Sequence, residues 1–499
     1  MKIAGIDIGT TGCKCTVYGE DGTFVTEAYE EYKAVISKTS HTLDPELVWE
    51  KLCNILKEIG TAEPEIEAIG ITSFGESCIF LDECDHPLTE SVLYTDPRGE
   101  EEWQEITAQL GADYLYEHTG LKPGRMYSAP KWRWLSKYDP DVLDRSCHIC
   151  LFEDYIVYML SGVFQVDYSI AARTMAFDVY QLKWDPHILK LSGVTAEKLS
   201  EPVPTGTAAG RMKREVQQLF GFRGRPMIVS GCHDQLAAAI GTGVLNEKMA
   251  VDGTGTVECI TTIFNRDSTV GEQVLYKSGI AVVPFLNGLF ASYVFSYTGG
   301  ALLKWYRDQL AALEADMLKA EGKNAYEEFN RQIDRYHPSG LLVLPYFAGA
   351  GTPYMDEQAK GVIAGLTIDT TRHQIYQGLM EGVTYEMKLN LNQLAKAGIK
   401  VKELYATGGG ANSKEWLQMK ADILGCKVIS LGAAQSGTLG CIMLAAVACG
   451  ICKDLDQAAK VFLTYKDTYL PRKSVKAEYQ KLYEQYIELY PALKRKGEQ

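Results

Sequence analysis

The sequence has no excess of positive charge and no long hydrophobic run. Its 499 residues include 50 Lys and Arg against 64 Asp and Glu, which gives a formal net charge of −14. Nucleic-acid-binding domains normally present a basic face, so nucleic acid is not an expected partner. Without a run of about 18 apolar residues, no membrane-spanning helix is expected. The first residues alternate and then turn at Gly9, unlike a signal peptide.

The sequence also lacks a disulfide pattern. Its 13 cysteines are odd in number and stand mostly among apolar residues, which favours reduced, buried thiols in a cytoplasmic enzyme. Two Cys-x-x-Cys spacings, Cys147/Cys150 and Cys449/Cys452, have hydrophobic flanks, so core packing is favoured over a zinc or redox site. The acidic stretch 82–86 resembles a metal cluster, but its position predicts a hairpin turn.

The first 72 residues predict a mixed sheet flanked by helices. Asp44-Pro45 is typical of a helix start, because Asp caps a helix and Pro fits its first turn. Apolar residues at helical spacing carry that helix to Gly60. The expected strands are Ile3–Ile8, Cys13–Tyr18, a third from Thr23, and Ile66–Thr72. The order β-β-β-α-β belongs to the α/β class.

The opening pattern recurs near the middle of the chain. Asp7 is followed, after one residue, by Gly9-Thr10 in a turn between β-type runs. Asp252, 245 positions later, is followed directly by Gly253-Thr254 in a similar turn. A repeat at half the chain length indicates two related α/β halves rather than a solenoid. No Pro- or Ser-rich linker is present, so we expect domains 1–245 and 246–499 with a ligand-binding cleft between them.

Three Gly/Thr turns follow predicted strands, at 9–12, 253–256 and 407–412. Glycine lets consecutive N–H groups approach an anion, and Lys14 adds a positive charge beside the first turn. Together the turns indicate phosphate binding. The Walker pattern and a Gly-x-Gly-x-x-Gly turn in a βαβ context are both absent, so a nucleotide must be held in another way.

Three acidic residues have two readings each. Asp7 would repel phosphate unless Mg²⁺ lies between them, which predicts a magnesium site; the alternative is that Asp7 caps its own turn. For Asp252 the structural role is favoured. Asp234 follows the buried strand ending at Gly231 and opens an Ala-rich helix at about Gln235, where it acts either as a bland helix cap or as the general base for a substrate hydroxyl. His233 is expected to point away from Asp234 and to be structural.

These motifs, taken in order, resemble the FGGY carbohydrate kinases, which include glycerol kinase and xylulokinase. The resemblance spans almost the whole chain. Its motifs are Gly5–Thr11, Tyr94–Arg98, Gly231–Gln235, Gly253–Gly255, Leu344–Leu366 and Gly408–Gly425. It implies a duplicated RNase H-like fold of the actin/hexokinase type, and ATP- and Mg²⁺-dependent phosphorylation of a sugar or polyol hydroxyl. A homodimer is left open.

The resemblance also assigns residues to roles. Asp234 would be the general base, and Asp7 with Asp234 would place Mg²⁺, largely through water. The acceptor would lie against Gly75, Glu76, Tyr94, Asp96, Tyr127, Asp234 and Gln235. ATP would contact Gly9, Thr10, Thr11, Lys14, Gly253, Thr254, Gly255, Gly299, Gly300, Gly408, Gly409 and Asn412.

The identity of the acceptor depends on Gly75-Glu76. At these two positions the xylulokinase pattern has Met-His, whereas the pattern of glycerol kinase and the autoinducer-2 kinases is similar to Arg-Glu. This chain keeps the Glu and has Gly in place of the Arg. Gly75 in place of Arg is expected to leave room for a longer acceptor, and Glu76 suits vicinal hydroxyls unless it turns to solvent. A ketose such as xylulose is favoured. The alternatives are glycerol, another polyol or an autoinducer-2-like acceptor, or a non-catalytic sugar-sensing regulator. Gln435 stands where the family usually has Glu, and 477–493 is expected to be a packing helix.

Overall fold

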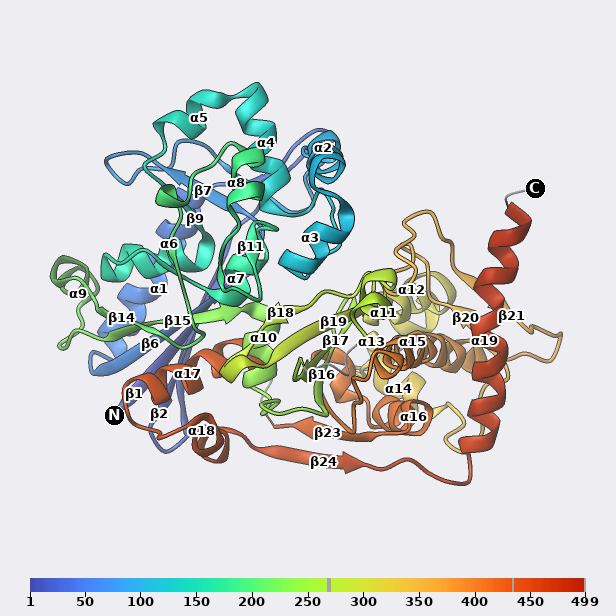
Figure 1. Cartoon of the computed structure of the whole chain (residues 1–499). Helices are drawn as coiled ribbons and strands as arrows, with labels where there is room; N and C mark the ends of the chain where they lie inside the picture. Colours follow the sequence, from blue (N-terminus) through green and yellow to red (C-terminus); the bar gives the residue numbers. More distant parts are fainter. Residues whose placement is uncertain (267–270, 433–434, 498–499) are drawn as a thin grey trace. The chain divides into compact units, whose positions relative to one another are not determined.

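The computed structural model describes residues 1–266, 271–432 and 435–497 (Figure 1). The chain forms two compact units. Unit 1 comprises Met1–Leu245, Ala281–Ala291 and Gln435–Leu463, and unit 2 comprises Asn246–Ile280, Ser292–Ala434 and Thr464–Gln499. By packing, two short segments from the second half of the sequence therefore belong to unit 1. The division into domains 1–245 and 246–499 stays a prediction.

Unit 1 is built on a six-stranded mixed sheet. Its strand order is β14-β15-β6-β1-β2-β3. Strand β1 pairs antiparallel with β2 and parallel with β6, and β6 pairs parallel with β15. The four strands expected near the N-terminus are confirmed. The bounds are β1 Lys2–Ile8, β2 Gly12–Gly19, β3 Phe24–Glu31, β6 Ile66–Ser73, β14 Ala208–Arg211 and β15 Met227–His233.

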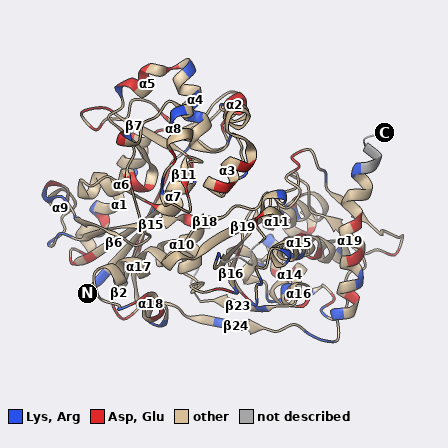
Figure 2. Ribbon diagram, in the orientation of Figure 1, with Lys and Arg blue, Asp and Glu red and all other residues tan. Residues whose placement is uncertain are grey.

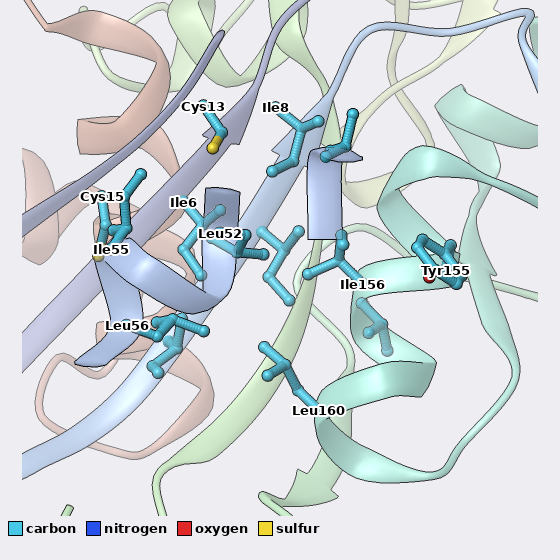
Figure 3. Close-up of a cluster of buried hydrophobic side chains, with 14 of the residues drawn as sticks. Ile6, Ile8, Cys13, Cys15, Leu52, Ile55, Leu56, Tyr155, Ile156 and Leu160 are labelled. Carbon is cyan, nitrogen blue, oxygen red and sulfur yellow. The ribbon is translucent and has the colours of Figure 1, made fainter. Parts of the chain in front are cut away.

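The predicted first helix is α1, Pro45–Ala62, and Asp44 caps it by accepting the N–H of Glu46. Its apolar face packs on the sheet from one side, beside α6 (Phe152–Ser161). Figure 3 shows Leu52, Ile55 and Leu56 of α1 gathered with the side chains of β1, β2 and α6 in this core. Burying each such side chain contributes about 1.5–3 kcal/mol to the stability of the fold. This packing holds β1 in place, including its last residues before the first glycine turn.

Helix α17, Ser436–Ala448, belongs to unit 1 although it comes late in the sequence. Figure 1 shows it, in orange-red, against the blue strands near the N-terminus, and it packs on β1, β6 and α10 (Asp234–Ile240). Glycine permits the close approach. A Cβ on Gly440 would lie 2.0 Å from the carbonyl oxygen of Ala237, and one on Gly70 would lie 2.3 Å from that of Cys441.

Unit 2 repeats the strand pattern of unit 1. Strand β16 pairs antiparallel with β17 and parallel with β22, which pairs parallel with β23. The full order is β18-β19-β17-β16-β22-β23-β24, where β18 and the first two residues of β19 fall in unit 1. The internal repeat is therefore confirmed. The bounds are β16 Met249–Thr254, β17 Glu258–Phe264, β18 Val283–Pro284, β19 Phe290–Ser296, β22 Glu403–Thr407, β23 Lys427–Leu431 and β24 Tyr465–Tyr469.

Helices cover the unit 2 sheet and include the expected C-terminal helix, α19 (Lys476–Gly497). Its tyrosines at 479, 483, 486 and 490 are buried in the core with α15 (Arg372–Lys396) and α16 (Lys414–Leu424), which confirms a packing helix. Figure 2 shows both acidic and basic residues along the ribbon of α19. Of the described helices, none combines the length and hydrophobicity that crossing a bilayer requires. A cytoplasmic location and a homodimer stay predictions.

The remaining elements surround these two sheets. In unit 1 they are β4 Val35–Ile36, β5 His41–Leu43, β7 Cys78–Leu81, β8 Ser91–Val92, α2 Glu100–Leu110, α3 Ala112–Thr119, α4 Ser128–Tyr138, α5 Pro140–Arg145, β9 His148–Leu151, β10 Gln165–Asp167, α7 Tyr168–Ala172, β11 Phe177–Asp178, β12 Lys183–Trp184, α8 Pro186–Ser192, β13 Glu201–Val203, α9 Arg214–Phe220 and α18 Leu455–Phe462. In unit 2 they are α11 Glu272–Lys277, α12 Gly300–Trp305, α13 Ala312–Ala320, α14 Ala325–Arg331, β20 Leu342–Leu344 and β21 Val362–Ala364.

All 13 cysteines are free thiols, but the expectation that they are buried holds only in part. In the two Cys-x-x-Cys pairs Cys150 and Cys452 are buried, whereas Cys147 is exposed and Cys449 is half-buried. The acidic stretch 82–86 is a turn, in which Asp82 donates its N–H to the carbonyl of His86 at 3.0 Å. Its carboxylate accepts the N–H groups of Cys84 and His86.

Candidate functional site

Asp234 stands where strand β15 ends and helix α10 begins. It is the first residue of the helix, and the position before it, His233, is the helix cap. One carboxylate oxygen of Asp234 accepts the N–H of Gln235 at 2.6 Å, and the side chain stays one-third exposed. The alternative that Asp234 is the helix cap is therefore wrong by one position. Strand β15 runs two residues beyond Gly231, so His233 takes the cap position. The carboxylate is held by the backbone yet open to a ligand.

The surroundings of Asp234 raise the pKa of its carboxyl group toward neutral pH. Burial raises its pKa to about 7, and the negative charges of Asp7 and Glu76 add to the increase. The N–H of Gln235 and the charge of Arg173 oppose it. A general base works best when its pKa lies near the working pH, because it is then both deprotonated and able to accept a proton.

His233 contacts Asp234, contrary to the expectation that the two side chains point apart. Its Nε2 lies 3.3 Å from Oδ1 of Asp234. Strand alternation no longer applies here, because the register of β15 shifts before His233 and the chain turns into a helix. Burial, with the charge of Arg173 second, holds the pKa of His233 well below its usual range, so the ring is neutral.

The first glycine turn places a second carboxylate near Asp234. Asp7 lies one residue before the end of β1, opposite Lys14 on β2. Burial raises its pKa to about 6, and Lys14 opposes the increase. The turn is closed by backbone, from the N–H of Gly9 to the carbonyl of Gly12 at 2.9 Å, and Tyr32 donates to the carbonyl of Gly9 at 2.6 Å. Within the described chain, the Asp7 carboxylate takes no hydrogen bond from this turn, which argues against the capping alternative.

The N-terminus of helix α17 borders the same carboxylate. A Cβ on Gly437 would lie 3.0 Å from Oδ2 of Asp7, so the absence of a side chain there leaves the carboxylate room. Thr10 is partly exposed and Thr11 is exposed, at the tip of the turn. Unit 1 thus combines the carboxylates of Asp7 and Asp234, the lysine Lys14 and a glycine turn whose threonines reach solvent.

Glu76 is buried, so the alternative that it turns to solvent is wrong. It adopts a left-handed backbone conformation, with φ 66°. Its carbonyl accepts the hydroxyl of Ser128 at 2.6 Å, and its Oε1 accepts Nε of Arg173 at 2.6 Å. The Arg173 guanidinium lies 5.4 Å from the centre of the buried Tyr127 ring.

The room expected beside Gly75 is occupied. A Cβ on Gly75 would lie 2.7 Å from Cγ of Arg173 and 2.8 Å from its Cβ. The stem of Arg173 therefore packs against Gly75, and the expectation of extra space for a longer acceptor is wrong. A positive charge is nevertheless present beside Glu76, because Arg173, 97 positions further along the chain, pairs with it.

The remaining acceptor candidates differ in what they can offer. Tyr94 is 40% exposed, and its pKa is raised by partial burial and then by the charges of Glu76 and Asp234, which places its phenol near both carboxylates. Asp96 is buried and bound by Nε of Arg98 at 2.9 Å and by the N–H of His41. This carboxylate holds the segment in place. Gln235 is partly buried at the second position of α10.

In unit 2 the predicted nucleotide segments come together. The N–H of Gly299 donates to the carbonyl of Thr256 at 2.8 Å, and that of Gly300 to Gly255 at 2.7 Å. A Cβ on Gly408, where φ is +79°, would lie 2.6 Å from the carbonyl oxygen of Thr254. Gly253 pairs with Thr407, and Gly409–Asn412 forms a short 3₁₀ turn beside them. Segments 150 positions apart thus form one backbone-lined cluster.

One member of that cluster points inward. The Thr254 hydroxyl is buried and accepts Nζ of Lys420 at 2.6 Å. Lys420 also pairs with Asp252 and, at 3.2 Å, with Glu258. Burial and the charge of Asp252 raise the pKa of Glu258 to about 8. This closed network supports the structural role favoured for Asp252 and occupies the Thr254 hydroxyl.

Sequence reasoning missed Arg173, Lys420 and one further acidic group. His118, Asp178 and Asp185 place ligand atoms within 4.8 Å of one another, the one such group among the described residues. Both Asp side chains already cap backbone: Asp178 accepts the N–H groups of Tyr180 and Gln181, and Asp185 those of His187 and Ile188. Arg173 and Lys420 have partners far away in the sequence and no local pattern marks them. Asp185 does stand before a proline, as Asp44 does, but that pattern indicates a helix start and not a cluster with His118 and Asp178.

Comparison with known proteins defines first the fold and then the family. A xylulose kinase structure from Lactobacillus acidophilus matches with a TM-score of 0.88 at 24% identity, covering 99% of this chain and 98% of that one. A xylulose kinase from Rhodospirillum rubrum matches with a TM-score of 0.89 at 21% identity over the full length of both chains. The predicted two-domain α/β fold of the actin/hexokinase type is confirmed.

The family models for the N- and C-terminal domains of the FGGY carbohydrate kinases match residues 2–241 and 276–449. The chain belongs to the FGGY family of carbohydrate kinases. It is 26% identical to a xylulose kinase of Lactococcus lactis, covering 98% of this chain and 96% of the relative. It is 27% identical to a gluconokinase of Bacillus subtilis, covering 97% and 94%. It is 26% identical to a glycerol kinase of Oceanobacillus iheyensis, covering 93% of each.

Proposed function

We propose that this carbohydrate kinase transfers the γ-phosphoryl group of ATP to a hydroxyl of a small sugar or polyol, with a ketose such as xylulose favoured, and that Asp234 is its general base. One observation carries the proposal: a backbone-held, partly exposed carboxylate with a pKa near 7 lies within the field of a buried Glu76–Arg173 pair. The similarity to xylulose kinases, gluconokinases and glycerol kinases over nearly the whole chain supports a sugar or polyol as the acceptor.

The chemistry assigned to unit 1 is deprotonation and positioning. The acceptor hydroxyl gives its proton to Asp234 as its oxygen bonds to the γ-phosphorus, and the bond from that phosphorus to the bridging oxygen of ADP breaks. Glu76 accepts hydrogen bonds from neighbouring hydroxyls. Tyr94 and Tyr127 offer ring faces to the C–H side of the acceptor. Asp96 keeps the Tyr94 segment in place through Arg98 and His41.

The glycine turns are assigned to ATP. In unit 2 the backbone of 253–255, 299–300 and 408–412 borders the nucleotide, and in unit 1 the turn at 9–12 with Lys14 faces phosphate oxygens. Carboxylate oxygen is the ligand that Mg²⁺ prefers, and Asp7 and Asp234 lie close enough for the charge of one to raise the pKa of the other. These two residues therefore fit a magnesium ion, held largely through water. When bound, that ion neutralises phosphate charge.

A screen for ADP release against ketoses, polyols and sugar acids tests the function. With the best acceptor, Asp234→Asn and Asp234→Ala should lower kcat by about 10²–10⁴ while leaving ATP affinity unchanged. Asp113→Asn, an exposed carboxylate on α3, is the matched control and should behave as wild type. Full turnover in Asp234→Ala would remove Asp234 from its role. A wild-type chain that phosphorylates none of these compounds would refute the proposal.

A further inference from the structure

The acceptor region of unit 1 contains a cation that arrives from a distant part of the chain. Arg173 follows helix α7, and its side chain passes directly over Gly75. Only a residue without Cβ permits this path, because a Cβ on Gly75 would overlap the Arg173 stem at 2.7–2.8 Å. The guanidinium emerges between Glu76 and Tyr127. Gly75 and Arg173 therefore act as a complementary pair: one supplies the space that the other fills.

The ion pair between Arg173 and Glu76 is one-sided. Both Nε and one terminal nitrogen of Arg173 address the same oxygen, Oε1 of Glu76. Among the described residues, no hydrogen bond reaches Oε2 of Glu76. A carboxylate can accept about four hydrogen bonds, so Oε2 retains capacity for a ligand hydroxyl. Arg173 side-chain exposure is 10% and that of Glu76 is 6%, so any such contact forms in a largely dry environment.

Asp234 lies within the same field. The charge of Arg173 lowers the pKa of Asp234, whereas the charges of Glu76 and Asp7 raise it. The neutral ring of His233 lies between the carboxylate and Gly75, since its Cδ2 is 3.4 Å from the position of a Gly75 Cβ and its Nε2 is 3.3 Å from Asp234. The region thus contains three carboxylates, Asp7, Glu76 and Asp234, against one guanidinium and Lys14.

We propose that Arg173 is an acceptor-binding residue, and that its neutralisation by Glu76 makes the site select uncharged polyhydroxy acceptors over sugar acids. This inference rests on the proposed function, because it concerns the same acceptor site. A hydroxyl donates to Oε2 of Glu76, and a neighbouring hydroxyl or carbonyl oxygen of the acceptor accepts from Arg173. A vicinal diol or a hydroxyketone meets both requirements.

A sugar acid meets this site badly. Its carboxylate would compete with Glu76 for Arg173 and would face the like charges of Glu76 and Asp234 in a region of low dielectric. Burying one more unpaired carboxylate there is unfavourable. The gluconokinases and the xylulose kinases among the relatives each share about a quarter of their residues with this chain, so neither name decides the acceptor.

The first experiment separates binding from a purely structural role. With the best neutral acceptor, Arg173→Gln should raise the acceptor KM about 10- to 100-fold, because a charged hydrogen bond is lost, and should leave the ATP KM unchanged. Arg173→Lys should recover part of that loss. The Arg173→Gln/Glu76→Gln variant, which leaves no buried charge unpaired, should fold and keep the raised KM. Wild-type acceptor KM in the double variant would show that Arg173 only supports the fold.

The second experiment moves the guanidinium. Gly75→Ala should raise the acceptor KM by displacing Arg173. In the Gly75→Arg/Arg173→Gly exchange, the arginine introduced at position 75 can occupy the space that Arg173 leaves. The acceptor KM of this exchange variant should be closer to the wild-type value than that of Arg173→Gly alone. No recovery in a folded exchange variant, judged by an unchanged ATP KM, would contradict the assignment.

The third experiment tests the charge argument. Wild type should prefer xylulose or another neutral polyol to gluconate, and Glu76→Gln should shift the kcat/KM ratio toward gluconate by at least about tenfold, since Arg173 then meets the substrate carboxylate directly. A wild-type preference for gluconate would overturn this inference while leaving the proposed kinase intact. The absence of turnover with every acceptor would instead refute the proposed function.

Discussion

The two glycine-turn hairpins of this chain, β1–β2 and β16–β17, have the same strand pairing but differ in what surrounds their aspartates. Asp7 on β1 and Asp252 on β16 occupy equivalent places, each with an antiparallel partner on one side and a parallel strand on the other. Asp7 is partly exposed, with a pKa raised to about 6. Asp252 is fully buried and paired with Lys420. The same turn therefore supports an open carboxylate in unit 1 and a closed ion pair in unit 2.

The difference comes from the helix that approaches each aspartate. In unit 2, Lys420 of α16 reaches Asp252, Thr254 and Glu258 together. In unit 1, the N-terminus of α17 brings Gly437, which has no side chain, beside the Asp7 carboxylate. One copy of the repeat is thus filled by its own lysine, whereas the other keeps space for a ligand. A duplicated sequence motif does not carry a duplicated role.

The largest expected effect is on stability in unit 2. Lys420→Met leaves Asp252 and Glu258 buried without a cation, and should lower the free energy of unfolding by about 3–5 kcal/mol. Urea unfolding of the full chain measures it. Lys453→Met, at a 78% exposed side chain, is the matched control and should change stability by less than about 0.5 kcal/mol. A small loss in Lys420→Met would mean that the network is not closed.

The same substitution in the two hairpins should act in opposite directions. Folding raises the pKa of Asp7 from 3.8 to about 6, so its charged form is disfavoured in the folded chain at every pH above 6. That cost fades as the pH falls through 6 toward 3.8. Asp7→Asn should therefore stabilise the chain at pH 7.5 by about 1 kcal/mol, discounted for partial exposure, while impairing turnover.

Asp252→Asn should instead destabilise it, because Lys420 loses its main partner. Comparing the urea midpoints of the two Asn variants at pH 7.5 and pH 5 measures both effects, and the gain from Asp7→Asn should shrink at the lower pH. If both variants moved the midpoint in the same direction at pH 7.5, the contrast between the open and the closed carboxylate would be wrong.

Local sequence signals predicted the elements of this fold well. Alternation and turn residues gave the strands near the N-terminus, Asp44 marked the start of α1, and the spacing of Asp7 and Asp252 revealed the repeat. These features depend on residues that are close in sequence. Asp234 was also found locally, since a buried strand followed by a helix defines its place.

Long-range contacts were not predictable in the same way. Arg173 meets Glu76 across 97 positions and Lys420 meets Asp252 across 168, and neither arginine nor lysine stands in a distinctive local pattern. Gly75 signalled a missing side chain but not that another residue fills the space. The contact of His233 with Asp234 depends on where β15 gives way to α10, a boundary that sequence places only to within a few residues.

The smallest expected effect is a shift in pH dependence that couples the two carboxylates of unit 1. The pKa of Asp234 is raised to about 7, so kcat/KM should fall about tenfold per pH unit below pH 7, where the base becomes protonated. Asp7 contributes to that increase, and Asp7→Asn should therefore move the acidic limb to lower pH, by less than about one unit. Profiles of kcat/KM for the best acceptor measure the shift, with Asp113→Asn as a control that should leave the limb in place. A limb that stays near pH 7 in Asp7→Asn would show that the charge at position 7 does not reach the base, and that the open hairpin serves phosphate alone.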